Sequence, residues 1–203
     1  MKETILNKAM DMFLTLGFKS VTMDDIATEM SISKKTIYQY YANKNELVSA
    51  VATQLVNRIS DDIDQIALAG HNPMKELFEI KNHIKAILDD KYMAPLHQLK
   101  KYYNDISVKL RSQQFDKMHN SVMDNIQRGM DEGLYRTNLD KEFISRLYFT
   151  VIVGIKEGEV FPAEIFSQQQ LTQMYLEYHL RAIASPKGLN LLEEYLQNDL
   201  ENY

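Results

Sequence analysis

A short basic stretch holds the residues of this chain that are best suited to contact nucleic acid. Residues 31–45 contain three lysines and no acidic residue, with hydroxyl and amide side chains among the lysines. Lysines neutralise phosphates, whereas glutamine and threonine can hydrogen-bond with base edges. Ile37 and Tyr41, four residues apart, would form the buried stripe of a short helix and leave the polar residues facing outward. An ordinary solvated surface is the alternative, but it gives outward tyrosines little reason to be there.

Three closely spaced helix starts position this stretch. Thr22 and Asp25 have the spacing of a capping box, and Ser33 and Asn43 are two further N-cap residues. Two short helices, separated only by residues 31–32, would therefore precede a longer helix. This is the helix-turn-helix arrangement, whose second helix enters the DNA major groove. The candidate DNA-contacting residues are Thr22, Ser33, Lys34, Lys35, Thr36, Tyr38, Gln39, Tyr40 and Lys44.

The residue types in this set suggest different roles. We expect Lys44 and Tyr40 to hold phosphates, and Thr22 to approach a phosphate through its hydroxyl and the start of its helix. The residues expected nearest the bases are Thr36, Lys35 and Gln39.

Residues 5–48 resemble the N-terminal domain of the TetR (tetracycline repressor) family of bacterial transcription regulators. The matching residues are Ile5, Ala9, Phe13, Gly17, Phe18, Val21, Thr22, Asp25, Ile26, Ala27, Ser33 to Tyr38, Tyr41, Lys44, Glu46 and Leu47. The family often has glycine at the position of Ser31, so a positive φ there would cost serine a modest amount. It also often has glycine at the position of Lys35, where lysine adds a phosphate partner. The resemblance implies a helix-turn-helix DNA-binding domain over residues 1–48 and a helical regulatory domain over residues 49–203 for ligand binding and dimerisation.

The charge of the chain is unevenly distributed. The 203 residues carry a net charge of −5, yet residues 1–50 hold six lysines and six acidic residues and are neutral. A basic face on a neutral domain can bind DNA, although long-range steering should be weak, so we expect two copies to act together. No apolar run could span a membrane and the N-terminus has no apolar signal core, which predicts a cytoplasmic protein. The absence of cysteine excludes disulfides and thiolate zinc sites.

Apolar residues recur every three to four positions along most of the chain, and alternating strand patterns are missing. The predicted fold class is therefore all-α. A first helix should end at Gly17, and a long helix from Lys44 should stop at residues 70–73, with a break allowed near residues 60–62. Later helices are expected over residues 73–89, 95–111, 113–130, 138–161, 167–184 and 189–200.

Two later helices carry features that suit a subunit interface. Gly154 and Gly158 have a spacing that allows close approach of helices, although a bend or a helix end would explain them as well. The TetR resemblance implies that the last two long helices form a four-helix interface between two subunits. The residues expected there are Leu147, Val151, Gly154, Gly158, Leu171, Met174, Tyr175 and Tyr178.

The middle of the chain is rich in aromatic and methionine residues, which can line an adaptable ligand cavity. Plain core packing is the stronger interpretation for each residue taken alone. The resemblance implies that some of these residues line an effector pocket, because family members typically release DNA when a small molecule binds. The candidates are Phe78, Ile87, Tyr102, Tyr103, Phe115, Met118 and Phe149.

No enzymatic or metal-binding motif stands out. The five histidines lack metal-site spacing, with His83 and Glu79 as the nearest approach to it, and no cofactor is expected. A nucleophile elbow, a P-loop and a dinucleotide fingerprint are absent, so an enzyme is not supported. The prediction is a homodimeric, ligand-responsive repressor that binds double-stranded operator DNA. A small-molecule sensor whose helix-turn-helix makes protein contacts stays open as the alternative, as does an activator.

Overall fold

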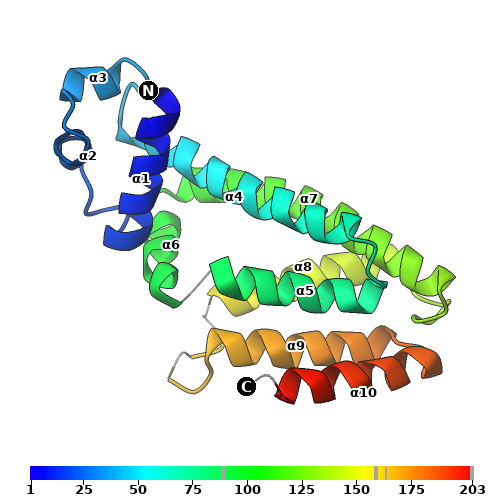
Figure 1. Cartoon of the computed structure of the whole chain (residues 1–203). Helices are drawn as coiled ribbons and strands as arrows, with labels where there is room; N and C mark the ends of the chain where they lie inside the picture. The colour runs from blue at the N-terminus through cyan, green and yellow to red at the C-terminus, as the bar shows by residue number, and fades with distance from the viewer. Residues whose placement is uncertain (88–89, 158–159, 163, 202–203) are drawn as a thin grey trace. The chain divides into compact units, whose positions relative to one another are not determined.

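The computed structural model describes residues 1–87, 90–157, 160–162 and 164–201, and it omits the side chains of residues 90–94, 157 and 198–201. The helices in this part are α1 (Lys2–Leu16), α2 (Met23–Glu29), α3 (Lys34–Tyr38), α4 (Lys44–Leu68), α5 (Pro73–Ile87), α6 (Asp90–Tyr102), α7 (Asn104–Asp131), α8 (Lys141–Glu157), α9 (Gln168–Ile183) and α10 (Pro186–Glu201) (Figure 1). No strand occurs among the described residues, and one isolated bridge joins Tyr135 and Ala184. The all-α prediction is therefore confirmed.

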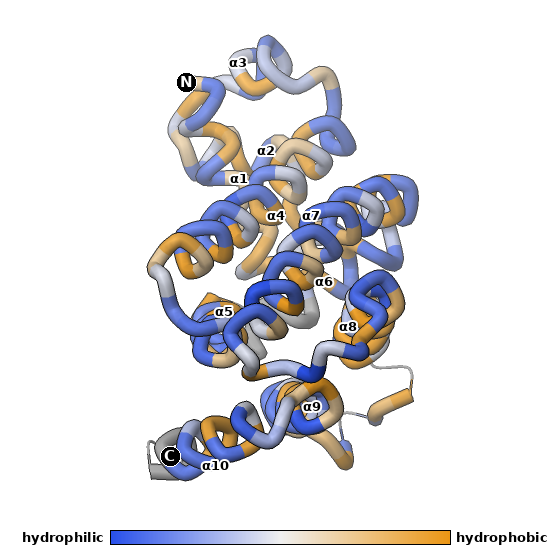
Figure 2. The backbone as a smooth tube through the Cα atoms, turned by 90° about the vertical axis from the view of Figure 1, so that its right-hand side faces the viewer, coloured by the Kyte–Doolittle hydropathy of each residue, from blue (hydrophilic) through white to orange (hydrophobic). Residues whose placement is uncertain are grey.

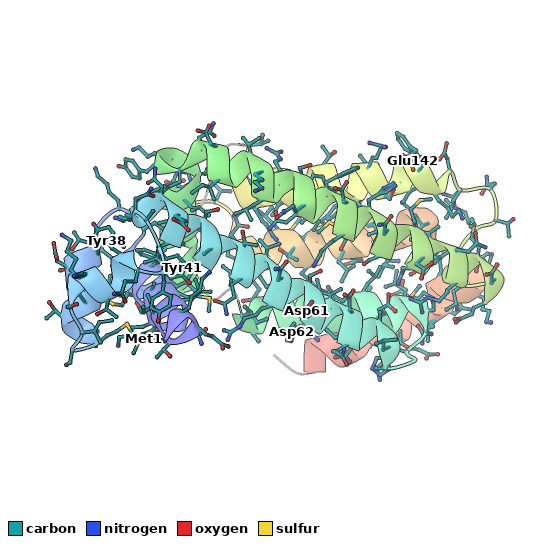
Figure 3. All side chains as sticks on the ribbon, turned by 90° about the horizontal axis from the view of Figure 1, so that it is seen from above. Met1, Tyr38, Tyr41, Asp61, Asp62 and Glu142 are labelled. Carbon is teal, nitrogen blue, oxygen red and sulfur yellow. The ribbon has the colours of Figure 1, made fainter. Side chains whose placement is uncertain are left out.

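The contacts of the chain divide it into two compact units. Unit 1 contains α1, α2, α3 and α6 with the first parts of α4 and α7, and unit 2 contains α5, α8, α9 and α10 with the remaining parts. The adjacent residues Asp61 and Asp62 mark the point in α4 where the chain passes from unit 1 to unit 2 (Figure 3). Helix α4 continues through this point without the break that the sequence allowed near residues 60–62.

The core of unit 1 is built from one apolar face of each helix. Ile5, Phe13, Ile26, Ile37 and Leu47 are fully buried and come from α1, α2, α3 and α4 in turn. Polar and apolar residues are interleaved along these helices, as Figure 2 shows, which is the pattern of helices with one buried face. This packing fixes α2 and α3 against α1 and α4.

Helix α6 also belongs to unit 1. It packs against α1, and its buried residue Leu99 joins the same core. Gly17 ends α1 with φ 96°, and beyond it the backbone N–H of Lys19 donates to Oε1 of Gln98 at 3.1 Å. The hydroxyl of Tyr103 donates to the carbonyl of Phe18 at 3.3 Å. The segment that leads into α2 is thus held from the C-terminal end of α6.

Unit 2 has a separate apolar core with a buried polar network beside it. Glu76, only 3% exposed, accepts a hydrogen bond from Asn125 at 2.8 Å and pairs with Arg128 at 2.5 Å. The hydroxyl of Tyr135 donates to Oδ1 of Asn125 at 3.2 Å. Burial and the neighbouring carboxylate of Glu76 raise the pKa of Tyr135. The network joins the start of α5 to α7, and each of its polar groups has a partner, as burial requires.

Several predicted helix boundaries were wrong: α8 begins at Lys141 and not at residue 138, α10 begins at Pro186 and not at residue 189, and two larger differences lie in the middle of the chain. Pro95 was expected to open a helix, but α6 begins at Asp90 and contains Pro95. Pro95 is the sixth residue of this helix, so its ring removes one backbone hydrogen bond within α6. The next break falls at Tyr103, before α7 runs unbroken for 28 residues, instead of near residue 112. Tyr103 is held by its bond to Phe18, a contact between segments far apart in the sequence that periodicity does not reveal.

Candidate nucleic-acid interface

The predicted capping residues form the expected hydrogen bonds. Oγ1 of Thr22 accepts from the backbone N–H of Asp25 at 3.1 Å, and the Asp25 carboxylate accepts from the N–H of Thr22 at 2.8 Å. Ser33 accepts from the N–H of Thr36 at 3.1 Å, and Asn43 accepts from the N–H of Glu46 at 2.9 Å. These bonds satisfy backbone donors at the starts of α2, α3 and α4. The helix-turn-helix is therefore fixed locally by side chains close in sequence.

The turn between α2 and α3 ends α2 in a left-handed conformation. Ser31 has φ 55°, the positive value expected where the TetR family often has glycine. Its N–H donates to the carbonyl of Thr28 at 3.0 Å, and the N–H of Ile32 donates to the carbonyl of Ala27 at 3.0 Å. This pair of bonds is the Schellman motif, which satisfies the last carbonyls of a helix.

Helix α3 presents a polar surface and buries its apolar side. Ile37 and Tyr41 are buried, and Tyr38 and Tyr40 are exposed. Figure 3 labels Tyr38 and Tyr41, which lie three residues apart on either side of the end of α3. Ser33, Lys34, Lys35 and Gln39 are also exposed, whereas Thr36 is half-buried. The helix itself ends at Tyr38, so Gln39 and Tyr40 lie in the turn after it.

The three lysines of this surface differ in their surroundings. Lys34 donates to the carboxylate of Asp24 on α2 at 2.6 Å, and this bond raises the pKa of its ammonium group. Lys44 donates to the carbonyl of Lys19 at 3.0 Å, and partial burial lowers its pKa. Lys35 is exposed and makes no ion pair among the described residues. Sequence reasoning identified these lysines but missed both Asp24 and Lys19, because neither partner is near in sequence.

The predicted ligand-pocket residues are distributed over both compact units. Tyr102 and Tyr103 lie in unit 1, where they contact Lys19 and Phe18 respectively. In unit 2, the rings of Phe115 and Phe149 lie 5.1 Å apart, while Phe78 packs against Tyr195 in the core. Ile87 and Met118 are half-buried, on α5 and α7 respectively.

The predicted interface residues on α8 and α9 include several exposed apolar side chains. Leu147, Met174 and Tyr178 are exposed, and so is Phe143, which sequence reasoning missed. Val151 and Tyr175 are half-buried, and Leu171 is buried. Gly154 has open space where a side chain would begin, and Gly158 lies outside the described residues.

Other polar groups have local explanations. Nε2 of His83 lies 3.0 Å from the carboxylate of Asp62 on α4, which was not the partner suggested by its spacing from Glu79. Within the described part of the chain, no cluster of three or more histidine or carboxylate residues is placed to hold a metal ion. Among the helices described, none combines the length and apolar character needed to cross a membrane.

Two family models match consecutive parts of the chain. Residues 5–51 match "Bacterial regulatory proteins, tetR family", and residues 48–185 match "YsiA-like protein, C-terminal region". The chain is 24% identical over 197 residues to the HTH-type transcriptional repressor KstR2 of Mycolicibacterium smegmatis, covering 92% of each chain. It is 22% identical over 153 residues to the fatty acid metabolism regulator protein of Bacillus subtilis, covering 73% of this chain and 77% of that one.

A solved structure supports the same fold. SmeT, the repressor of the Stenotrophomonas maltophilia multidrug efflux pump SmeDEF, superposes with a TM-score of 0.72 at 16% identity, covering 92% of this chain and 91% of that one. The matched models cover both the helix-turn-helix and most of the remaining helices. Family membership points to a regulator that binds DNA rather than to an enzyme. The chain belongs to the TetR family of bacterial transcriptional regulators.

Proposed function

We propose that two copies of this chain form a repressor that binds operator DNA through α2 and α3 and is released by a small-molecule effector. The observation that carries the proposal is the capped helix-turn-helix. Its second helix exposes Lys35 and Tyr38 and buries Ile37, and Gln39 is exposed directly after that helix. Such a surface suits phosphate neutralisation and base contacts in the major groove. The family of the chain supports this assignment.

Within this proposal the contacts at α3 have different weights. Lys35 is the cation most available to a phosphate, because Lys34 is held by Asp24 and Lys44 by the carbonyl of Lys19. Gln39, exposed just beyond the end of α3, is placed to contact base edges. The remaining predicted contacts, at Thr22, Ser33, Thr36 and Tyr40, stay part of the proposal.

The dimer is proposed from the apolar surface of α8 and α9. Phe143 is 60% exposed, Met174 59% and Tyr178 72%. Large exposed apolar side chains on two neighbouring helices indicate a protein interface. A second copy of the same surface would bury them symmetrically. In such a dimer, the two copies of α3 would have to lie one helical turn of DNA apart, about 34–36 Å, or a multiple of that, in order to enter successive major grooves.

The effector is proposed to be an apolar metabolite. Two similar proteins have names that refer to apolar metabolites. They are the ketosteroid transcriptional regulator KstR2 of Mycobacterium tuberculosis and the fatty acid metabolism regulator protein of Bacillus subtilis. In this chain, unit 2 offers aromatic contacts such as the Phe115–Phe149 pair. An effector acts only through a difference in its affinity for the DNA-bound and free forms. Operator DNA must therefore weaken effector binding by the same factor.

Salt-dependent binding to DNA tests the proposal. Fluorescence anisotropy with the DNA upstream of the gene and with random duplex should show tight upstream binding that weakens steeply between 50 and 200 mM salt, as about six phosphate contacts would require. Lys35→Ala should reduce the salt slope by about one, while Gln39→Ala should relax sequence preference. Lys117→Ala is the control, because Lys117 is an exposed lysine of unit 2. Weak, salt-independent binding to both duplexes would instead favour a sensor whose helix-turn-helix contacts protein.

A further inference from the structure

The hydroxyl of Tyr175 on α9 is buried and has no hydrogen-bond partner among the described residues. Its ring centroid lies 5.6 Å from that of Tyr148 on α8 and 5.9 Å from that of His179. Because the oxygen is already covered within one chain, a second subunit docked on the exposed side of α9 would not reach it. A buried hydroxyl without a partner is destabilising, so a native protein that retains one needs a reason for it.

His179 is a second buried polar group in the same place. It is 6% exposed, and its ring centroid lies 4.8 Å from that of Tyr148. Burial lowers the pKa of its imidazole to about 4, so the ring is neutral near pH 7. A neutral imidazole offers one N–H donor and one acceptor nitrogen.

Among the described residues, only burial and neighbouring phenols shift the pKa values of these rings, and no charged group does so. Burial raises the pKa of Tyr148 to about 12, and burial with the neighbouring phenols raises that of Tyr175, so both hydroxyls keep their protons. Two ion pairs on α8 and α9 join Arg146 to Glu142 and Arg181 to Glu177. A charged ligand group placed among the rings would be buried without a partner, which is costly.

We propose that Tyr175 and His179, together with Tyr148, bind the carbonyl oxygen of an uncharged, mostly apolar molecule. The proposal rests on the proposed function, in which this molecule is the effector of the regulator. A carbonyl oxygen has two lone pairs, which would accept from the phenol O–H and the imidazole N–H. The apolar remainder would contact the faces of the Tyr148 and Tyr175 rings, whose centroids lie 5.6 Å apart.

Three ten-carbon probes test this assignment with the full-length protein: 2-decanone, 2-decanol and decanoate. Calorimetric titration should give the tightest binding for the ketone and the weakest for decanoate. Tyr175→Phe keeps the ring and removes only the hydroxyl, so it should weaken 2-decanone binding by roughly 3- to 10-fold. The control is Thr137→Val, which removes an exposed hydroxyl elsewhere in unit 2 and should leave the affinity unchanged.

A second measurement separates ligand binding from folding. Without ligand, Tyr175→Phe should melt at the same temperature as the wild type or higher, because it removes an unpaired hydroxyl. A lower melting temperature would show that an internal water already satisfies the hydroxyl, and would overturn the proposal. Decanoate binding as tightly as 2-decanone, an unchanged ketone affinity in Tyr175→Phe, or no ketone binding would overturn it as well. Operator binding is measured on the same preparations. Failure to bind operator DNA would contradict the proposed function, whereas a failure of the ketone experiments with operator binding intact would contradict only the proposed carbonyl site.

Discussion

The replacement of Ser31 by glycine tests whether the turn that orients α3 carries conformational strain. Ser31 is exposed, has φ 55° and makes no side-chain hydrogen bond within the described residues, so a substitution acts mainly through the backbone. A left-handed conformation costs a non-glycine residue about 1–2 kcal/mol. Glycine gives back roughly 0.5–1 kcal/mol of this because it has more freedom in the unfolded chain. We therefore expect Ser31→Gly to stabilise the helix-turn-helix by about 0.5–1 kcal/mol.

Amide hydrogen exchange is the direct assay for this effect. The N–H groups of Ser31 and Ile32 close the Schellman motif at 3.0 Å each, so their exchange reports opening of the turn. A gain of about 0.5–1 kcal/mol should slow their exchange roughly 2- to 5-fold. Ser31→Ala is the matched control, since it removes the hydroxyl but keeps the cost of the left-handed conformation. Exchange in Ser31→Gly that is as fast as in Ser31→Ala would refute the reasoning.

Three further outcomes follow from the structure. Asp24→Asn removes the carboxylate bonded to Lys34 at 2.6 Å, so the salt slope for random duplex should steepen by about 0.9 per phosphate gained; an unchanged slope in anisotropy titrations would contradict this. Gly154→Leu has open space within a single chain, so the variant should fold, yet sedimentation should show weaker dimerisation if the subunits cross there; an unaltered dimer would place the crossing elsewhere. His179 has a folded pKa of about 4, below its ordinary value of 6.5, so the unfolded chain binds more protons between these values. Stability should be full above pH 6.5 and fall by about 3 kcal/mol as the pH drops to 4, and denaturant titrations of His179→Phe should show this dependence removed.

The parts of the fold that follow from neighbouring residues could be predicted from the sequence. Thr22, Ser33 and Asn43 cap helices because each side chain reaches a backbone N–H three residues later, a distance set by helix geometry alone. The positive φ of Ser31 was suggested by the family resemblance, in which this position often holds glycine, and not by the caps on either side of it. The family resemblance covered the same local segment.

Contacts between distant segments could not be predicted in this way. Gln98 lies 79 residues from Lys19, and no periodicity indicates that its side chain holds the start of the helix-turn-helix. Tyr175 was assigned to the subunit interface because it shares an apolar spacing with Met174 and Tyr178. Periodicity defines the apolar sides of α9, but it does not indicate which side packs against the rest of the same chain. In the structure, the Tyr175 hydroxyl is buried by residues of its own chain.

The ion pair between Asp24 and Lys34 also affects how the regulator searches a genome. A lysine already bonded to its own carboxylate attracts random DNA less than a free one, and the first 50 residues carry no net charge. Non-operator sites outnumber operators by about a million-fold or more. Each lysine that cannot contact non-operator DNA therefore reduces the fraction of regulator molecules bound at non-operator sites. We therefore expect a weak general affinity for DNA, which would let a small number of copies per cell keep an operator occupied.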